Sequence, residues 1–129
     1  MGEKKLPRPT DAELGILRVL WARGDSTVRE VLDDLSETTP TGYTTVLKQM
    51  QIMTEKGLVI RDERERAHVY RARLTEQRTQ RQLLTDLLDR AFGGSATNLV
   101  MQALTSRKTD PDELATIRQF LDQLEREQS

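Results

Sequence analysis

The chain has 129 residues, a length that fits one compact domain or one small domain with an appended helical module. Its 20 Lys and Arg residues against 21 Asp and Glu residues give a net charge of −1, so bulk charge does not indicate a nucleic-acid partner. The lack of cysteine excludes disulfides, Cys-ligated zinc and thiol nucleophiles, and no apolar run approaches the roughly 18 residues of a membrane span, so we expect a cytoplasmic protein.

Three short helices are predicted in the first half of the chain. Residues 10–23 open with Thr and Glu at capping-box spacing, and the same spacing recurs where a second helix begins near Thr27. A turn with Pro and Gly separates this helix from a third, over about residues 43–56. Apolar residues at helical period give the helices inward faces: Leu14, Leu17, Leu20 and Trp21, then Val28, Val31, Leu32 and Leu35, then Val46, Met50 and Met53.

A β-hairpin is predicted next. Residues 58–61 and 68–73 are rich in β-branched and aromatic residues, and the charged segment 62–67 between them has the character of a turn. Three helices followed by a hairpin is the element order of a winged helix-turn-helix domain.

The rest of the chain is predicted to be helical. A helix over about 76–92 is capped by the threonine before it, and a short helix over about 96–105 follows a Gly-Gly-Ser break. An Asp-Pro pair then starts a last helix at residue 110. The predicted fold class is mainly α with a small β-hairpin: a winged helix-turn-helix domain at residues 1–74 and a helical dimerisation domain at residues 75–129.

The third helix has the character of a recognition helix, which such a motif lays in the major groove of DNA. Opposite its inward face lie Thr44, Thr45, Lys48 and Gln51. Threonine methyls can meet thymine methyls, glutamine can pair with adenine, and lysine can reach guanine or phosphate. No acidic residue interrupts this face before Glu55. An ordinary solvated helix face is the alternative interpretation.

The hairpin supplies cations. Five arginines fall between residues 61 and 73, and guanidinium groups suit phosphates and narrow minor grooves. The alternative is a hairpin kept from aggregating by charge, which the neighbouring Asp62, Glu63 and Glu65 favour. The five are Arg61, Arg64, Arg66, Arg71 and Arg73.

Enzymatic chemistry is not indicated. His68 is the only histidine, and a lone histidine in a strand is more often a hydrogen-bonding or phosphate-contacting residue than a metal ligand. The sequence has no Ser/His/Asp arrangement and no Gly-rich phosphate loop, and helix capping explains the carboxylates near Asp110. We therefore expect no catalytic residue, no metal and no cofactor.

Several short motifs carry a family resemblance. They are Thr10–Glu13, Val19–Trp21, Val28–Leu32, Gly42–Val46, Glu55–Val59, Ala67–Tyr70 and Phe92–Gly94. In their order and spacing, over about residues 8–125, they resemble the penicillinase-repressor (BlaI/MecI/CopY) family of transcriptional regulators.

The resemblance implies a homodimeric repressor that binds an inverted-repeat, palindromic operator in double-stranded DNA through the winged helix of each subunit. It implies base contacts by Thr44, Thr45 and Lys48, and contacts with the DNA backbone or grooves by Tyr43, Arg64, Arg66 and His68. The C-terminal helices also hold more leucines than three short helices can bury alone, which favours a partner subunit. The implied dimer contacts, for some of which intrachain core is the alternative, are Leu84, Leu87, Leu88, Leu99, Leu104, Ile117 and Leu121.

The resemblance does not identify the signal that releases the protein from DNA. In relatives tied to β-lactam sensing, a membrane-bound sensor protease leads to cleavage of the C-terminal module at an Asn-Phe bond. The matching bond here is Gln102–Ala103, a departure from that pattern. Copper-responsive relatives use a C-terminal cysteine cluster, which this chain lacks. Two alternative functions stay open: a winged helix that contacts proteins, and a winged-helix regulator that senses a small molecule.

Overall fold

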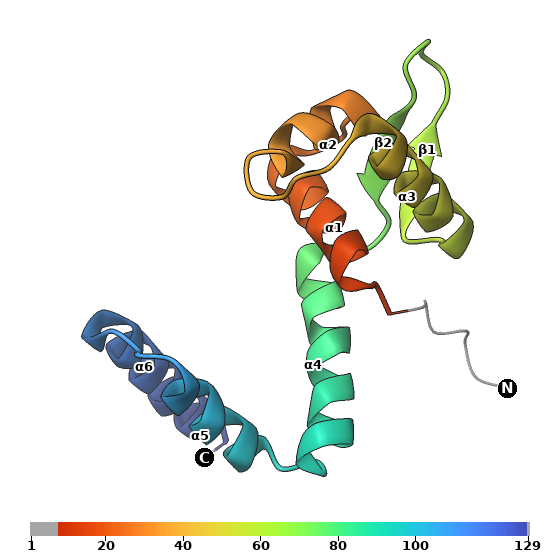
Figure 1. Cartoon of the computed structure of the whole chain (residues 1–129). Coiled ribbons are helices and arrows are strands. Elements are labelled where there is room, and N and C mark those ends of the chain that lie inside the picture. Colours follow the sequence, from red (N-terminus) through yellow and green to blue (C-terminus); the bar gives the residue numbers. More distant parts are fainter. Residues whose placement is uncertain (1–7, 129) are drawn as a thin grey trace, which may run out of the picture. The chain divides into compact units, whose positions relative to one another are not determined.

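The computed structural model describes residues 8–128, which form two compact units, one ending at Leu83 and the other beginning at Leu84 (Figure 1). The first unit contains three helices, a β-hairpin and the start of a fourth helix. The second contains the end of that helix and two more. The elements are α1 (Asp11–Arg23), α2 (Val28–Leu35), α3 (Tyr43–Lys56), β1 (Val59–Asp62), β2 (Val69–Ala72), α4 (Glu76–Phe92), α5 (Ala96–Ser106) and α6 (Pro111–Gln128).

Local capping fixes the starts of α1 and α2. Thr10 accepts a hydrogen bond from the backbone N–H of Glu13, whose side chain accepts one from the Thr10 N–H, and Thr27 and Glu30 repeat this arrangement at α2. Both predicted capping boxes are therefore confirmed. The core of the unit is apolar and lies between the three helices and the hairpin. Its buried members are Ile16, Leu17, Leu20, Val28, Val31, Leu32, Val46, Met50, Met53, Leu58, Val59 and Tyr70.

The predicted inward faces are mostly correct. In α1, however, Ile16 is 1% exposed and was not among the residues expected to face inward, whereas Leu14 and Trp21 are only partly buried. A hydrogen bond to the segment between β2 and α4 explains the difference for Trp21, because its indole N–H donates to the Leu74 carbonyl at 3.0 Å and so holds the side chain at the margin of the core.

The hairpin is antiparallel, with Val59 opposite Ala72 and Asp62 opposite Val69. A third backbone segment joins it, because Ser26 and Tyr70 exchange two N–H to carbonyl hydrogen bonds of 3.0 and 2.8 Å. The fully buried Ser26 thus ties the connection between α1 and α2 to β2. Three helices with a hairpin attached in this way form the predicted winged helix.

The first turns of α4 belong to the winged-helix unit. The Thr75 hydroxyl caps α4 by accepting from the Arg78 N–H, and Thr79 is buried where it lines a small cavity with Leu17 and Leu58. The two compact units therefore divide inside α4, whereas the sequence suggested a domain limit at residue 74, before the helix begins.

The second unit consists of short-range helical structure with little buried surface. Ser95 caps α5, and the Asp110 carboxylate accepts from the N–H groups of Asp112 and Glu113, which confirms the predicted helix starts. Neither α5 nor α6 contains a buried residue. Among the helices that the structure describes, none is long and apolar enough to cross a membrane.

Candidate nucleic-acid interface

Helix α3 presents a polar face to solvent. Thr44, Thr45, Lys48 and Gln51 are exposed, while Val46, Met50 and Met53 on the other side of the helix are at most 2% exposed. Gly42, the residue before the helix, supplies no side-chain cap, and the first turn of α3 contains no acidic residue. The beginning of α3 therefore offers a positive helix end and short hydrogen-bonding side chains, which suit a polyanion.

The other end of α3 is anchored by a partly buried ion pair. The Lys56 ammonium donates to both carboxylate oxygens of Glu13, at 3.1 and 2.9 Å, and Glu13 is only 4% exposed. Burial by itself raises the pKa of this carboxyl, but the Thr10 N–H and the Lys56 ammonium outweigh burial and hold the pKa below its ordinary value. The pair joins α3 to the start of α1 and so fixes the direction in which the polar face points.

An arginine of α2 lies over the first residue of α3. The guanidinium carbon of Arg29 is 5.1 Å from the centre of the Tyr43 ring, within the range of a cation–π contact. Both residues are exposed. Nearby, Arg23 bridges the carboxylates of Glu30 and Asp34 at 3.0 Å each, which joins α1 to α2 on the surface.

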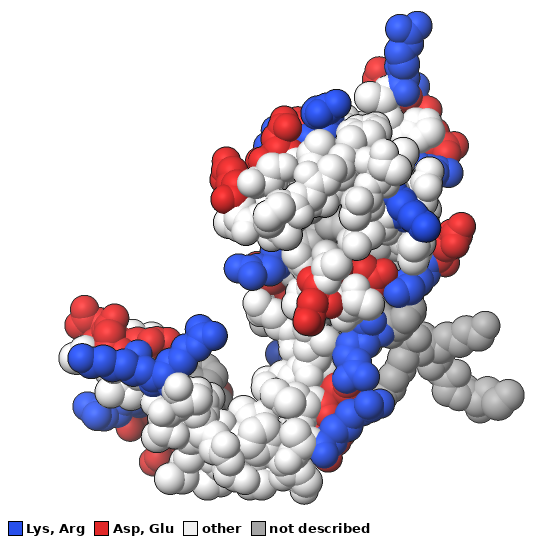
Figure 2. Space-filling model, viewed as in Figure 1, with Lys and Arg blue, Asp and Glu red and all other residues white. Residues whose placement is uncertain are grey.

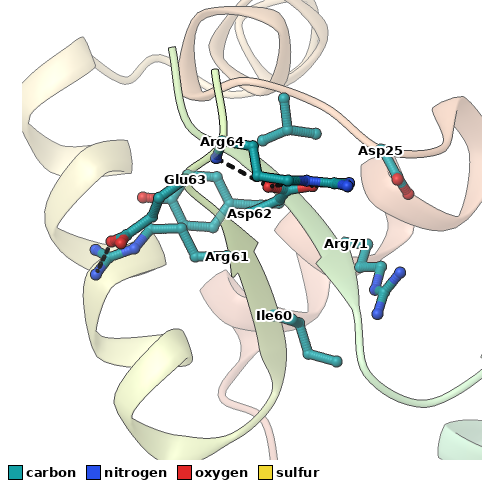
Figure 3. Close-up of a pocket in the computed structure, with 9 residues that line it drawn as sticks. Asp25, Ile60, Arg61, Asp62, Glu63, Arg64 and Arg71 are labelled. Atoms are coloured by element: carbon teal, nitrogen blue, oxygen red, sulfur yellow. Dashed lines mark hydrogen bonds and ion pairs between the residues drawn. The ribbon is translucent and has the colours of Figure 1, made fainter. Parts of the chain in front are cut away.

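The wing carries its arginines in pairs with acids. Arg64 binds Asp62 through Nε, Nη2 and its own backbone N–H, and Arg61 binds Glu63 (Figure 3). The Arg64 guanidinium holds the pKa of Asp62 at about 2. These two pairs border an open pocket of about 320 Å³, whose lining is Asp25, Ile60, Arg61, Asp62, Glu63, Arg64, Val69, Tyr70 and Arg71.

The predicted wing residues thus differ in their surroundings. Arg66 and His68 are exposed and make no ion pair within the described part of the chain, but Arg64 is engaged by an acid two positions away. The hairpin loop and the beginning of α3 lie at the same upper end of the unit in Figure 1. On the winged-helix unit, acidic and basic side chains are interspersed on the face shown in Figure 2.

The C-terminal residues predicted to form a dimer interface are not buried within the chain. Leu84, Leu87 and Leu121 are exposed, and Leu88, Leu99, Leu104 and Ile117 are partly buried. Gln102 and Ala103, at the predicted cleavage position, are exposed within α5, and the Gln102 amide donates to Asn98 one turn earlier.

Sequence reasoning missed several surface residues of this unit and of α2. Among the residues that the structure describes, Met101 and Phe120 are the most exposed large apolar ones, at 62% and 58%. Phe120 falls in the helical series formed with Ile117, Leu121 and Leu124, so its periodicity was a usable signal. Arg29 had no comparable signal, because its relation to Tyr43 depends on the packing of two helices.

Comparison with known proteins gives consistent matches over most of the chain. The penicillinase repressor family model matches residues 9–123. The chain is 24% identical over 120 residues to a penicillinase repressor of Bacillus licheniformis, covering 93% of this chain and 94% of that protein. It is 30% identical over 122 residues to the transcriptional regulator BlaI of Mycobacterium tuberculosis, covering 94% of this chain and 88% of that protein.

Two solved structures are similar in fold. One is a solution structure of the monomeric form of Bacillus licheniformis BlaI in complex with the blaP half-operator, with 28% identity and a TM-score of 0.50 over 58% of this chain and 92% of that chain. The other, of the DNA-binding domain of the repressor BlaI, has the same identity and TM-score over 57% of this chain and 90% of that chain. These matches confirm the predicted winged-helix fold.

Proposed function

The chain belongs to the penicillinase repressor family, and we propose that it acts as a homodimer on an inverted-repeat operator. It is a DNA-binding transcriptional repressor and not an enzyme. The proposal also covers which residues contact DNA, how the chain dimerises and how the repressor is released from DNA. It places this action in the cytoplasm.

The exposed polar face of α3 is the observation that carries the DNA-contact proposal. Thr44, Thr45 and Lys48 lie in the first half of the helix, where a recognition helix meets base edges, and Gln51 continues the same face. Buried side chains on the opposite face hold the helix against the core. Tyr43, Arg64, Arg66 and His68 contact the backbone or the neighbouring groove in this proposal.

Exposed apolar side chains support a homodimer formed by the C-terminal unit. Monomeric soluble proteins rarely leave large apolar patches in water, and α5 and α6 bury no residue within the chain. A second copy of the chain can cover these side chains. Because two joined winged helices make the second half-site contact intramolecular, dimerisation raises operator affinity by roughly two to four orders of magnitude.

Selection of bound sequences from random DNA by the purified full chain tests the proposal. We expect an inverted repeat, and Lys48→Ala should weaken binding to it. Recovery of a single half-site would contradict the dimer. Binding that is insensitive to both Lys48→Ala and Arg64→Ala would contradict the assigned interface and favour a winged helix that contacts proteins. A rise in melting temperature with a small metabolite would favour the ligand-sensing alternative.

A charged substitution in the exposed apolar face of the C-terminal unit should disrupt the dimer without unfolding the chain. Phe120→Glu should yield a monomer by sedimentation, with binding of the full operator weakened toward that of a half-site, because Phe120 is already 58% exposed in the single chain and its loss leaves no cavity. Gln119→Glu adds the same charge on the neighbouring position of α6 and serves as the control. A dimeric Phe120→Glu variant would place the interface elsewhere.

Cleavage between Gln102 and Ala103 is the release step in this proposal, carried out by a membrane sensor protease. The cut would remove α6 and the end of α5, and with them the exposed side chains of Leu114, Phe120, Leu121 and Leu124. Because both residues lie inside a helix, α5 must unwind locally before a protease can bind the bond. Mass spectrometry of the chain from cells treated with a β-lactam should detect a fragment ending at Gln102; an intact chain during derepression would refute this step.

A further inference from the structure

Arg29 lies at the N-terminal end of α2, a position where a positive charge is unfavourable. It is the second residue of α2, in the first turn, where the helix dipole presents partial positive charge. Its guanidinium stands 5.1 Å from the Tyr43 ring centre, beside the first residue of α3, whose own first turn has no acidic residue. Residues that break a local rule in this way are often functional.

The acids nearby do not compensate Arg29. Glu30 is bound by Arg23 and by the Thr27 N–H, and Asp34 is bound by Arg23. Within residues 8–128, Arg29 itself forms no ion pair, and its defined interaction is the stack on Tyr43. A stacked guanidinium uses its face and keeps its N–H edge available for two hydrogen bonds, the geometry that matches a phosphate.

The position of the stack relates it to the DNA-contacting face. Tyr43 directly precedes Thr44 and Thr45, and in a helix-turn-helix the helix before the recognition helix crosses the DNA backbone. A phosphate bound at Arg29 would therefore flank the bases that α3 meets. Contacts of this kind set the register of a protein on the duplex.

We propose that Arg29 and Tyr43 act as one unit that grips a single DNA phosphate, with the tyrosine ring holding the guanidinium in place, so that α3 is fixed in register. This inference rests on the proposed DNA interface and adds to it a positioning residue from α2. Tyr43 serves as the support for Arg29 and need not contact a base.

The test is operator binding by the full chain at several salt concentrations. Arg29→Ala should lower affinity about tenfold and reduce the magnitude of the salt slope by about 0.9, the value of one lost phosphate contact. The loss should be similar for operator and unrelated DNA. Tyr43→Ala should also weaken binding, and the double variant should lose less than the sum of the two single losses, because the ring and the guanidinium act together.

The control is Arg78→Ala, which removes one exposed arginine from α4 of the same unit. A slope change in this variant equal to that of Arg29→Ala would overturn the proposal, since only net charge would then matter. Lower affinity with an unchanged slope for both Arg29→Ala and Arg29→Gln would also overturn it, because the stack would then only brace two helices. If the wild-type chain bound no operator, the proposed interface itself would fail, an outcome distinct from these.

Discussion

Removal of the Lys56 ammonium should destabilise the winged helix in a pH-dependent way. Lys56→Met keeps a flexible chain of similar length but withdraws the cation from Glu13. Oε1 of Glu13 then keeps its bond from the Thr10 N–H, whereas Oε2, which the ammonium contacts at 2.9 Å, loses its hydrogen bond. The variant thus leaves a charged carboxylate in a site that is 4% exposed.

The contacts set the expected size of this effect. A hydrogen bond to a charged group contributes about 1.5–3 kcal/mol, and a buried charge without its partner costs more. The Lys56 side chain is 34% exposed, so water reaches the ammonium and reduces the loss. We expect the free energy of unfolding to fall by about 2 kcal/mol at pH 7, which corresponds to roughly 8–16 °C in the melting temperature of a small domain.

The sign of the pH dependence follows from the lowered pKa of Glu13. A carboxyl whose pKa is lower in the folded state stabilises the fold above its unfolded pKa, about 4.5, and this stabilisation is lost as the pH falls through the folded pKa. The difference between wild type and Lys56→Met should therefore be largest at neutral pH and shrink below about pH 4.5.

Urea denaturation followed by the fluorescence of Trp21, the single tryptophan, measures this difference within the winged-helix unit. Lys48→Met is the control, because it removes an exposed lysine from the same helix and should change stability by less than about 0.5 kcal/mol. An equal deficit at pH 7 and pH 3.5 would show that Lys56 acts through packing and would refute the electrostatic reasoning.

Three further substitutions test the wing, the Trp21 hydrogen bond of α1 and the end of α3. Asp62→Asn should release Arg64 and raise DNA affinity about threefold at fixed salt. Binding by the wild type should not change through titration of Asp62 between pH 5 and 8, since the pKa of this carboxyl is about 2. Weaker binding by the variant would mean that Asp62 positions Arg64 for DNA. Trp21→Phe removes the bond to the Leu74 carbonyl and should cost about 1 kcal/mol by circular-dichroism melting. Gly57→Ala places a side chain at φ +82° and should cost about 1–2 kcal/mol in urea denaturation, and a neutral result would contradict the assigned backbone.

Features governed by near neighbours in the chain could be predicted from sequence. Thr10 and Thr27 cap helices through contacts three residues away, and Gly57 ends α3 at the expected position. The polar face of α3 follows from the 3.6-residue period. The element order, the approximate helix limits and the winged-helix fold therefore rest on signals that a sequence carries locally.

Features that depend on packing could not be predicted in this way. The sequence shows that Arg64 and Asp62 are near neighbours, but only the turn conformation brings Arg64 back onto the carboxylate instead of leaving it free for phosphate. The Arg29–Tyr43 stack and the burial of Glu13 against Lys56 depend on how separate helices meet. The candidate interface could thus be located on α3 and the wing, while the availability of each cation could not.

The bond between the Trp21 indole and the Leu74 carbonyl has a consequence for folding kinetics. It joins positions 53 apart, and the Ser26–Tyr70 pair likewise connects the segment between α1 and α2 to the hairpin. Closing such long loops carries an entropic cost that the helices, built from contacts within one turn, do not incur. The helices therefore form early and the wing docks late, and by the same reasoning the wing opens first from the native state. Backbone amides of β1 and β2 should exchange with deuterium before those of the core helices, so the hairpin, which comes after the three helices in sequence, should be less protected than they are.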